Sequence, residues 1–89
     1  MARTTGTASL GDLLRKGLLK EGERLVIRRR SAPSIGATLQ ADGRIRLGRD
    51  VYETPSAAAR SALGIKATDG WLRWRVPRLE GKTLAEVRG

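Results

Sequence analysis

The dipeptide Asp42-Gly43 constrains the fold more than any other feature of this sequence. Apolar residues occupy every second position on both sides of it. They are Ala37, Leu39, Ala41, Ile45 and Leu47. A period of two is typical of strands that bury one face. Asp-Gly favours a two-residue type I′ turn, which needs a positive φ at both central residues. The sequence therefore predicts an antiparallel β-hairpin that turns at Asp42-Gly43.

Two further segments, residues 23–30 and 71–76, show the same alternation and are predicted to be strands. The side chains expected to face the core from them are Leu25, Ile27, Leu72, Trp74 and Val76. Pro77 ends the second segment, because proline cannot donate to a strand ladder. Trp74 is accordingly expected to be an ordinary core residue.

Three helices are predicted from their start and stop signals. They span residues 9–17, 55–63 and 83–88. Ser9, Thr54 and Thr83 can each cap the first turn of the helix that follows. Pro55 suits the first position of the second helix, and Gly64 suits its end. The alanines of that helix are small enough to let it lie close to a sheet.

Together these elements predict an α+β fold, with a small, mostly antiparallel sheet of about four strands and about three helices. The chain has 89 residues and a mass of 9.7 kDa, which corresponds to one domain or to a fragment of a larger protein. Residues 1–8 are small and polar and are expected to be a flexible lead-in to a domain over 9–89. No apolar run approaches the length of a membrane span, and no signal peptide is evident, so we expect a cytoplasmic location.

Cysteine and histidine are both absent from the sequence. Their absence excludes disulfides, thiolate zinc sites, cysteine nucleophiles and a Ser-His-Asp triad. Glu80-Gly81-Lys82, with Asp69 before it, is similar to the metal site of restriction-type nucleases. Such a site needs carboxylates that converge from rigid elements, whereas these residues fall in predicted turns and loops. We therefore expect a protein that is not an enzyme and that needs neither metal nor cofactor.

The net charge of +9 indicates a polyanionic partner. If the apolar faces of the strands point inward, a set of arginines lies on the opposite face. They are Arg24, Arg28, Arg30, Arg44, Arg46, Arg73 and Arg75, with Trp71 among them. So many guanidinium groups repel one another without an anion between them, and arginine is suited to phosphate and to stacking on bases. The alternative is an ordinary solvated face of a basic protein.

Two aromatic residues have two interpretations each. Trp71, on a face that is otherwise polar, either packs under a helix or contacts a partner such as a base. Tyr52 either packs at the edge of the sheet or contacts a base. The sequence alone leaves both alternatives open.

The order of these motifs resembles that of the restriction enzyme adenine methylase-associated (RAMA) domain. The resemblance covers roughly residues 9 to 88. The matching stretches are residues 9–14, 17–25, 37–45, 52–59, 69–74 and 84–88. It implies a domain that binds DNA without catalysis and that occurs beside DNA adenine methyltransferases, nucleases or deubiquitinase-like proteins. It also implies recognition of modified DNA, N6-methyladenine in particular.

The similar C-terminal domains of cell-cycle adenine methyltransferases imply specific DNA-contacting residues. There a serine at a helix start, an Asn-Gly-Trp turn and a late arginine contact DNA, and these positions correspond to Ser56, Trp71 and Arg88 here. Asp69 occupies the asparagine position. An aspartate lacks the amide donor and repels phosphate, although it can accept from a cytosine amino group. Local roles, a helix cap for Ser56 and dipole compensation for Arg88, remain as alternatives.

We therefore expect a DNA-binding domain associated with the nucleoid. Its candidate partners are DNA, including a methylated duplex, and a larger restriction or methyltransferase protein. The residues expected to contact DNA are Arg28, Arg30, Arg44, Arg46, Tyr52, Ser56, Asp69, Trp71, Arg73, Arg75 and Arg88. Neutralising about five phosphates predicts a log–log salt slope near −4.5. The alternative function is a protein-interaction or docking module that uses the basic face for an acidic partner. RNA binding is disfavoured, because RNA-binding sheets expose several aromatic residues.

Overall fold

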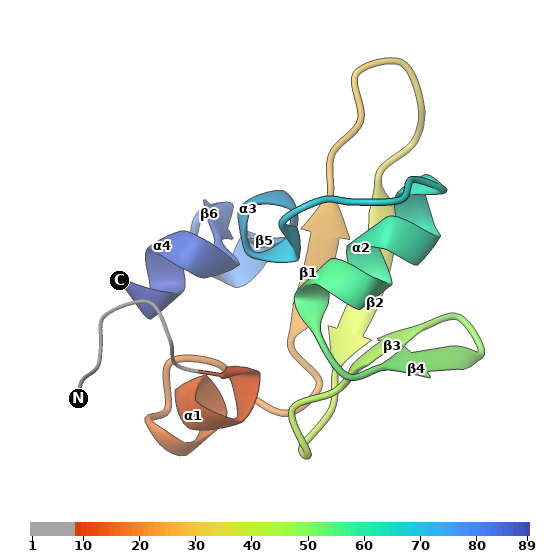
Figure 1. Ribbon diagram of the computed structural model, residues 1–89. Helices are drawn as coiled ribbons and strands as arrows, with labels where there is room; N and C mark the ends of the chain where they lie inside the picture. Colours follow the sequence, from red (N-terminus) through yellow and green to blue (C-terminus); the bar gives the residue numbers. More distant parts are fainter. Residues whose placement is uncertain (1–8) are drawn as a thin grey trace.

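The computed structural model describes residues 9–89, which form an α+β fold (Figure 1). Its six-stranded sheet is antiparallel throughout, in the order β4-β3-β2-β1-β5-β6. The strands are β1 (Arg24–Ile27), β2 (Ile35–Leu39), β3 (Ile45–Leu47), β4 (Asp50–Tyr52), β5 (Arg75–Val76) and β6 (Lys82–Thr83). The helices are α1 (Leu10–Arg15), α2 (Pro55–Leu63), α3 (Gly70–Arg73) and α4 (Leu84–Arg88), with a 3-10 turn, η1 (Pro77–Leu79). The predicted fold class is confirmed, although the sheet has six strands rather than about four.

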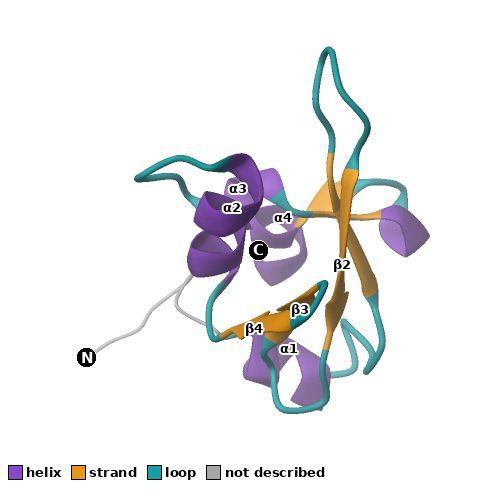
Figure 2. Cartoon of the chain, turned by 90° about the vertical axis from the view of Figure 1, so that its right-hand side faces the viewer, coloured by secondary structure: helices purple, strands orange, loops and turns teal. Residues whose placement is uncertain are grey.

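One side of the sheet carries α2, α3 and α4, and α1 lies at one end of it (Figure 2). The core between these elements consists of fully or almost fully buried apolar side chains. They are Leu10, Leu13, Leu19, Leu25, Ile27, Ala37, Leu39, Ile45, Ala58, Ala59, Trp74, Val76 and Leu84. The predicted inward positions of β1, β2 and β3 are confirmed. Residues 1–8, the expected lead-in, lie outside the described part of the chain. No helix within residues 9–89 is long and apolar enough to cross a membrane.

The hairpin of β2 and β3 is confirmed, but its turn differs from the predicted two-residue type. Gln40 N–H donates to Arg44 O at 2.8 Å, which leaves three residues in the loop. Only Gly43 of these has a positive φ, of 87°. The Asp42 carboxylate accepts from the backbone N–H of Arg44 at 2.9 Å. An aspartate that binds the backbone two residues ahead favours this wider turn, in which glycine takes the left-handed position.

The first strand is shorter than predicted. β1 ends at Ile27, and β2 begins at Ile35. Residues 28–34 form a loop that projects beyond the sheet in Figure 1, and we call this loop the arm. Arg28 and Arg30 therefore lie in the arm and not on the face of a strand, which corrects the prediction for both.

The segment predicted as a single strand over residues 71–76 is mostly helical. Gly70–Arg73 forms α3, and only Arg75 and Val76 pair with neighbouring strands. Trp74 is fully buried, as expected, but Leu72 is 60% exposed and not in the core. Trp71 and Trp74 are three residues apart, a spacing that also fits one face of a helix.

The predicted caps are confirmed at the starts of α1, α2 and α4. The Ser9 hydroxyl accepts from the backbone N–H of Asp12 at 3.2 Å, and that of Thr54 accepts from Ala57 N–H at 3.1 Å. Thr83 forms a capping box with Glu86. Helix α2 keeps its predicted bounds and ends at Gly64, whereas α1 ends two residues early, at Arg15.

A salt bridge ties the start of β1 to η1. The buried carboxylate of Glu23 accepts from Arg78 Nη2 at 2.7 Å and from Arg78 Nε at 3.0 Å. The Arg78 guanidinium holds the pKa of Glu23 below its ordinary value of 4.5, while burial opposes this shift.

Candidate nucleic-acid interface

A cleft of about 680 Å³ opens between α1, the β2–β3 turn, the start of α2 and the two C-terminal helices. Its lining consists of Ser9, Leu10, Gly11, Arg15, Asp42, Gly43, Arg44, Glu53, Thr54, Pro55, Trp71 and Arg88. At its floor the β2–β3 turn rests on α1, where a Cβ on Gly43 would lie 3.1 Å from the backbone nitrogen of Gly11. The missing side chain of Gly43 thus allows the hairpin to approach the backbone of α1 closely.

Trp71 and Arg88 form the aromatic part of the cleft. The Arg88 guanidinium lies over the Trp71 ring, with Cζ at 3.9 Å from the ring centroid. Both side chains are half-buried, and the indole packs against the hydrophobic core. An arginine on an indole face is an attractive cation–π pair. The pair combines aromatic and cationic character at a concave surface.

Helix α3, which carries Trp71, is fixed to the start of α2 by backbone contact. A Cβ on Gly70 would lie 2.1 Å from the carbonyl carbon of Pro55, so only glycine fits there. Gly70 N–H donates to the Ser56 hydroxyl at 2.9 Å, and Trp74 Nε1 donates to Pro55 O at 3.0 Å. These contacts give Ser56 a structural role, because its hydroxyl oxygen accepts a hydrogen bond from the backbone N–H of Gly70, the residue before Trp71.

Asp69 caps the same short helix. Its carboxylate accepts from the backbone N–H of Trp71 at 3.0 Å, and the side chain remains exposed. The family resemblance picked out Ser56, Asp69, Trp71 and Arg88. Asp69 and Arg88 contact Trp71 directly, Ser56 bonds Gly70 beside it, and of the four Trp71 and Arg88 line the cleft. All four surround the junction of α2, α3 and α4.

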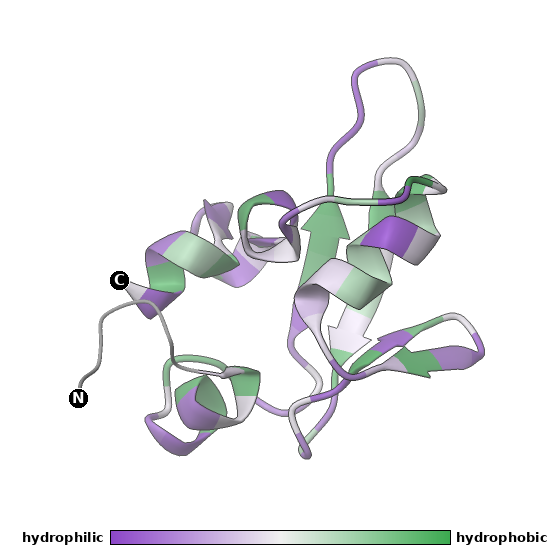
Figure 3. Cartoon of the chain, in the orientation of Figure 1, coloured by the Kyte–Doolittle hydropathy of each residue, from purple (hydrophilic) through white to green (hydrophobic). Residues whose placement is uncertain are grey.

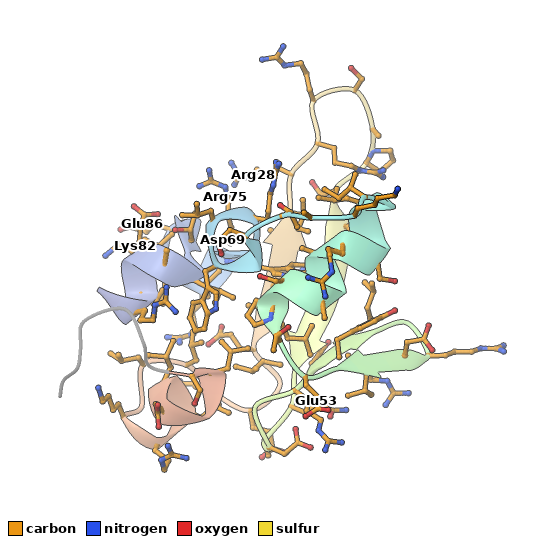
Figure 4. All side chains as sticks on the ribbon, viewed as in Figure 1. Arg28, Glu53, Asp69, Arg75, Lys82 and Glu86 are labelled. Carbon is orange, nitrogen blue, oxygen red and sulfur yellow. The ribbon has the colours of Figure 1, made fainter. Side chains whose placement is uncertain are left out.

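The charges in the cleft are mixed. Arg15 pairs with Asp12, and Arg44 Nε lies 3.8 Å from Asp42 Oδ2. Glu53 also lines the cleft, near the start of α2 (Figure 4), and forms no ion pair within residues 9–89. The cleft therefore offers hydrogen-bond acceptors as well as guanidinium donors.

The predicted single plate of arginines around Trp71 is wrong. The strand register places Arg24, Arg46 and Arg75 on the outer face of the sheet, opposite the core. Trp71 lies on the core side, and Arg44 lines the cleft. A single face was predicted because residues 23–30 were interpreted as one long strand and residues 71–76 as another. In the structure β1 ends at Ile27, and Gly70–Arg73 forms α3.

The remaining predicted residues have separate local contacts. Arg46 Nε donates to Gly48 O at 3.2 Å, and Arg73 Nε, on α3, donates to Thr68 Oγ1 at 3.0 Å. The Tyr52 hydroxyl bonds the Ser61 hydroxyl of α2 at 2.6 Å, and its ring packs against the core. Tyr52 is therefore a packing residue between β4 and α2, which is the first of its two interpretations.

A second group of cations lies at the other edge of the sheet. Arg75 Nη1 donates to Gly81 O at 2.9 Å, and Arg28 Nη2 would lie 3.6 Å from a Cβ placed on Gly81. Figure 4 shows these two side chains beside each other, with Lys82 and Glu86 nearby. The pKa of Glu86 is lowered, mainly by hydrogen bonds from Thr83 and further by the charges of Arg75 and Lys82.

Comparison with known proteins agrees with this arrangement of motifs. The family model described as Restriction Enzyme Adenine Methylase Associated (RAMA) matches residues 1–89, the whole chain. This chain belongs to the RAMA family. The family description places the RAMA domain in the context of restriction and adenine methylation. No curated protein matches the sequence.

Sequence reasoning missed several residues that line the cleft. Arg15 and Glu53 are examples, because each comes from an element whose neighbours in space are far away in the chain. The Gly11–Gly43 approach that joins α1 to the hairpin has no local sequence signal.

Proposed function

We propose that this RAMA domain is a non-catalytic DNA-binding module that contacts bases through the cleft beside Trp71. The observation that carries this proposal is the Trp71–Arg88 pair, an aromatic ring and a guanidinium stacked in a concave surface of a protein with a charge of +9. Guanidinium planes and indole rings both stack on nucleobases. The restriction and methylation context of the family makes duplex DNA the natural polyanion.

We further propose that the cleft distinguishes N6-methyladenine from adenine. Three kinds of group support this: the Trp71–Arg88 surface for stacking, the Glu53 carboxylate as an acceptor for an exocyclic N–H, and the apolar side chains of Leu10 and Pro55 for a methyl group. Burying one methyl contributes about 1 kcal/mol, or roughly a fivefold change in affinity. Such a difference is large enough to measure.

Binding can be measured by fluorescence anisotropy of a labelled duplex, with Trp71→Ala and Leu72→Ala as a matched pair. The two residues are neighbours in α3, but Trp71 lines the cleft and Leu72 lines a different hollow. Losing one stacking contact costs about 1–3 kcal/mol, so we expect Trp71→Ala to weaken binding about five- to 150-fold. Leu72→Ala should bind as the wild type does.

The adenine preference is measured with two duplexes that differ only in one N6-methyl group. A difference of roughly fivefold that disappears in Trp71→Ala supports base contact in the cleft. Equal affinities for both duplexes would leave a general DNA binder. Equal binding by Trp71→Ala and the wild type would overturn the cleft as the DNA-contacting surface.

A further inference from the structure

The arm, residues 28–34, carries a concentrated positive charge that the cleft lacks. All seven of its residues are exposed. Arg28, Arg29 and Arg30 follow one another, and the arm contains no acidic residue. The limb with these arginines is strongly hydrophilic in Figure 3. Three consecutive arginines concentrate positive charge in a short segment, and a bound anion offsets that charge.

The arginines of the arm are among those that have no carboxylate partner in the described part of the chain, as are Arg49 and Arg60. Arg15, Arg44 and Arg78 each pair with a carboxylate. Within residues 9–89 no arginine of the arm forms an ion pair. Arg29 Nε donates instead to Pro33 O at 2.9 Å, a bond across the arm that supports its projecting shape.

The base of the arm continues the same positive surface. Arg28 lies beside Gly81, whose carbonyl accepts from Arg75. Lys82 follows on β6, and the Glu86 carboxylate lies near Arg75 and Lys82 (Figure 4). Its oxygen is engaged by the Thr83 N–H at 2.8 Å, so it balances these cations only in part.

The arm and the cleft lie at different ends of the molecule. In Figures 1 and 2 the arm projects from the end of the sheet that is opposite α1, which forms the floor of the cleft. The longest axis of the molecule is 40 Å, the length of about twelve base pairs at 3.4 Å per step. One duplex is long enough to contact both regions.

We propose that the arm is a second DNA-contacting element, which binds backbone phosphates away from the base contacted by the cleft. This inference rests on the proposed DNA-binding function. The mixed charges of the cleft suit the edges of a base, whereas the purely cationic arm suits phosphate, which carries no sequence information. In this proposal the cleft contacts bases, and the arm contacts the phosphate backbone of the same duplex.

The test compares Arg29→Gln/Arg30→Gln with the control Arg49→Gln/Arg60→Gln. Both double variants lose two positive charges from exposed positions, and neither pair forms an ion pair within residues 9–89. Each phosphate contact contributes about 0.9 to the slope of log affinity against log salt. We expect the arm variant to lower the magnitude of this slope by about 1.8, and the control to leave it unchanged.

Two further readouts separate this inference from the proposed function. Tryptophan emission reports the cleft, because Trp71 lines it and Trp74 is fully buried. The arm variant should retain the change in emission that saturating DNA causes. Duplexes of about 8 and 16 base pairs should differ in affinity more for the control than for the arm variant, because only the longer duplex reaches the arm.

Each outcome decides between the two ideas. Equal slopes in the arm and control variants would overturn the role of the arm, while loss of binding in Trp71→Ala alone would still support the cleft. An arm-specific loss combined with normal binding by Trp71→Ala would overturn the cleft and retain the arm. If the wild-type domain did not bind duplex DNA, both proposals would fall.

Discussion

At the scale of single residues, Gly70 shows how closely this fold is assembled. Its missing side chain lets the backbone of α3 touch that of α2, where a Cβ would lie 2.1 Å from the carbonyl oxygen of Pro55. The same residue donates its N–H to Ser56. One glycine therefore sets the position of Trp71, the next residue in the chain.

Gly70→Ala should consequently destabilise the domain. The added methyl group meets rigid backbone rather than a movable side chain, and such overpacking costs about 1–3 kcal/mol or more. Urea denaturation followed by circular dichroism measures this loss. Gly36→Ala is the control, because the same methyl group there contacts only the flexible end of Arg24, at 3.5 Å, and should change stability by less than about 0.5 kcal/mol. Equal effects of the two substitutions would show that the close approach is not important.

The role of a residue could be predicted where its hydrogen-bond partner is close in the sequence, and stayed ambiguous where the partner is distant. Thr54, Thr83 and Ser9 were identified as caps, because a cap and its helix are adjacent in sequence. Ser56 and Tyr52 each had two interpretations. The bond between Tyr52 and Ser61 supports packing for Tyr52, whereas the bond between Ser56 and Gly70 gives Ser56 a role that neither interpretation named, and its contact with DNA stays a prediction.

At the scale of elements, α3 shows the limit of periodicity. A six-residue run with apolar residues at every second position fits a strand, but the tryptophans three apart fit a helix equally well. The helix forms because Asp69 caps it and because Gly70 packs against α2. The capping residue Asp69 is next to the helix in the sequence, whereas the contact between Gly70 and α2 exists only in the folded chain.

Glu23 and Arg78 join two elements that no sequence pattern connected, β1 and η1. The pKa of Glu23 is lowered in the folded state. The ionised carboxylate therefore contributes stability that is fully present above about pH 4.5 and is lost as the pH falls through the lower, folded-state pKa. Stability should fall with acidification in this range.

Glu23→Gln tests this link. The variant should lose about 1–2 kcal/mol at neutral pH, a value reduced because Arg78 is partly exposed. Its difference from the wild type should narrow in acid, below the folded-state pKa, where the wild-type carboxyl is also neutral. Urea denaturation of the variant and the wild type, at neutral pH and in acid, measures the difference in their free energy of unfolding under each condition. A difference that does not change with pH would contradict a role for the ionised carboxylate.

At the scale of the whole molecule, the charge of +9 is distributed over several surfaces. The outer sheet face, the cleft and the arm each carry arginines. Arginines could not be assigned correctly to these surfaces from the sequence alone, because the ends of the strands and the presence of α3 determine the assignment. The α+β class and the hairpin were predictable; the cleft was not, because it is built from segments that meet only in the folded chain.

The whole-molecule prediction concerns salt. Five phosphate contacts correspond to a slope near −4.5 between log affinity and log salt concentration. Titrations of the wild-type domain at several salt concentrations measure it. Excess unlabelled duplex should compete, whereas an acidic polypeptide of similar charge should compete poorly. Strong competition by the polypeptide would favour the protein-interaction alternative.

The backbone contact between α2 and α3 also has a kinetic consequence. Because the backbone of α3 packs directly on that of α2 at Gly70, the indole is positioned in the cleft before any partner arrives. Recognition then requires no prior rearrangement of this junction. Association should proceed in one step whose observed rate rises linearly with the concentration of the partner.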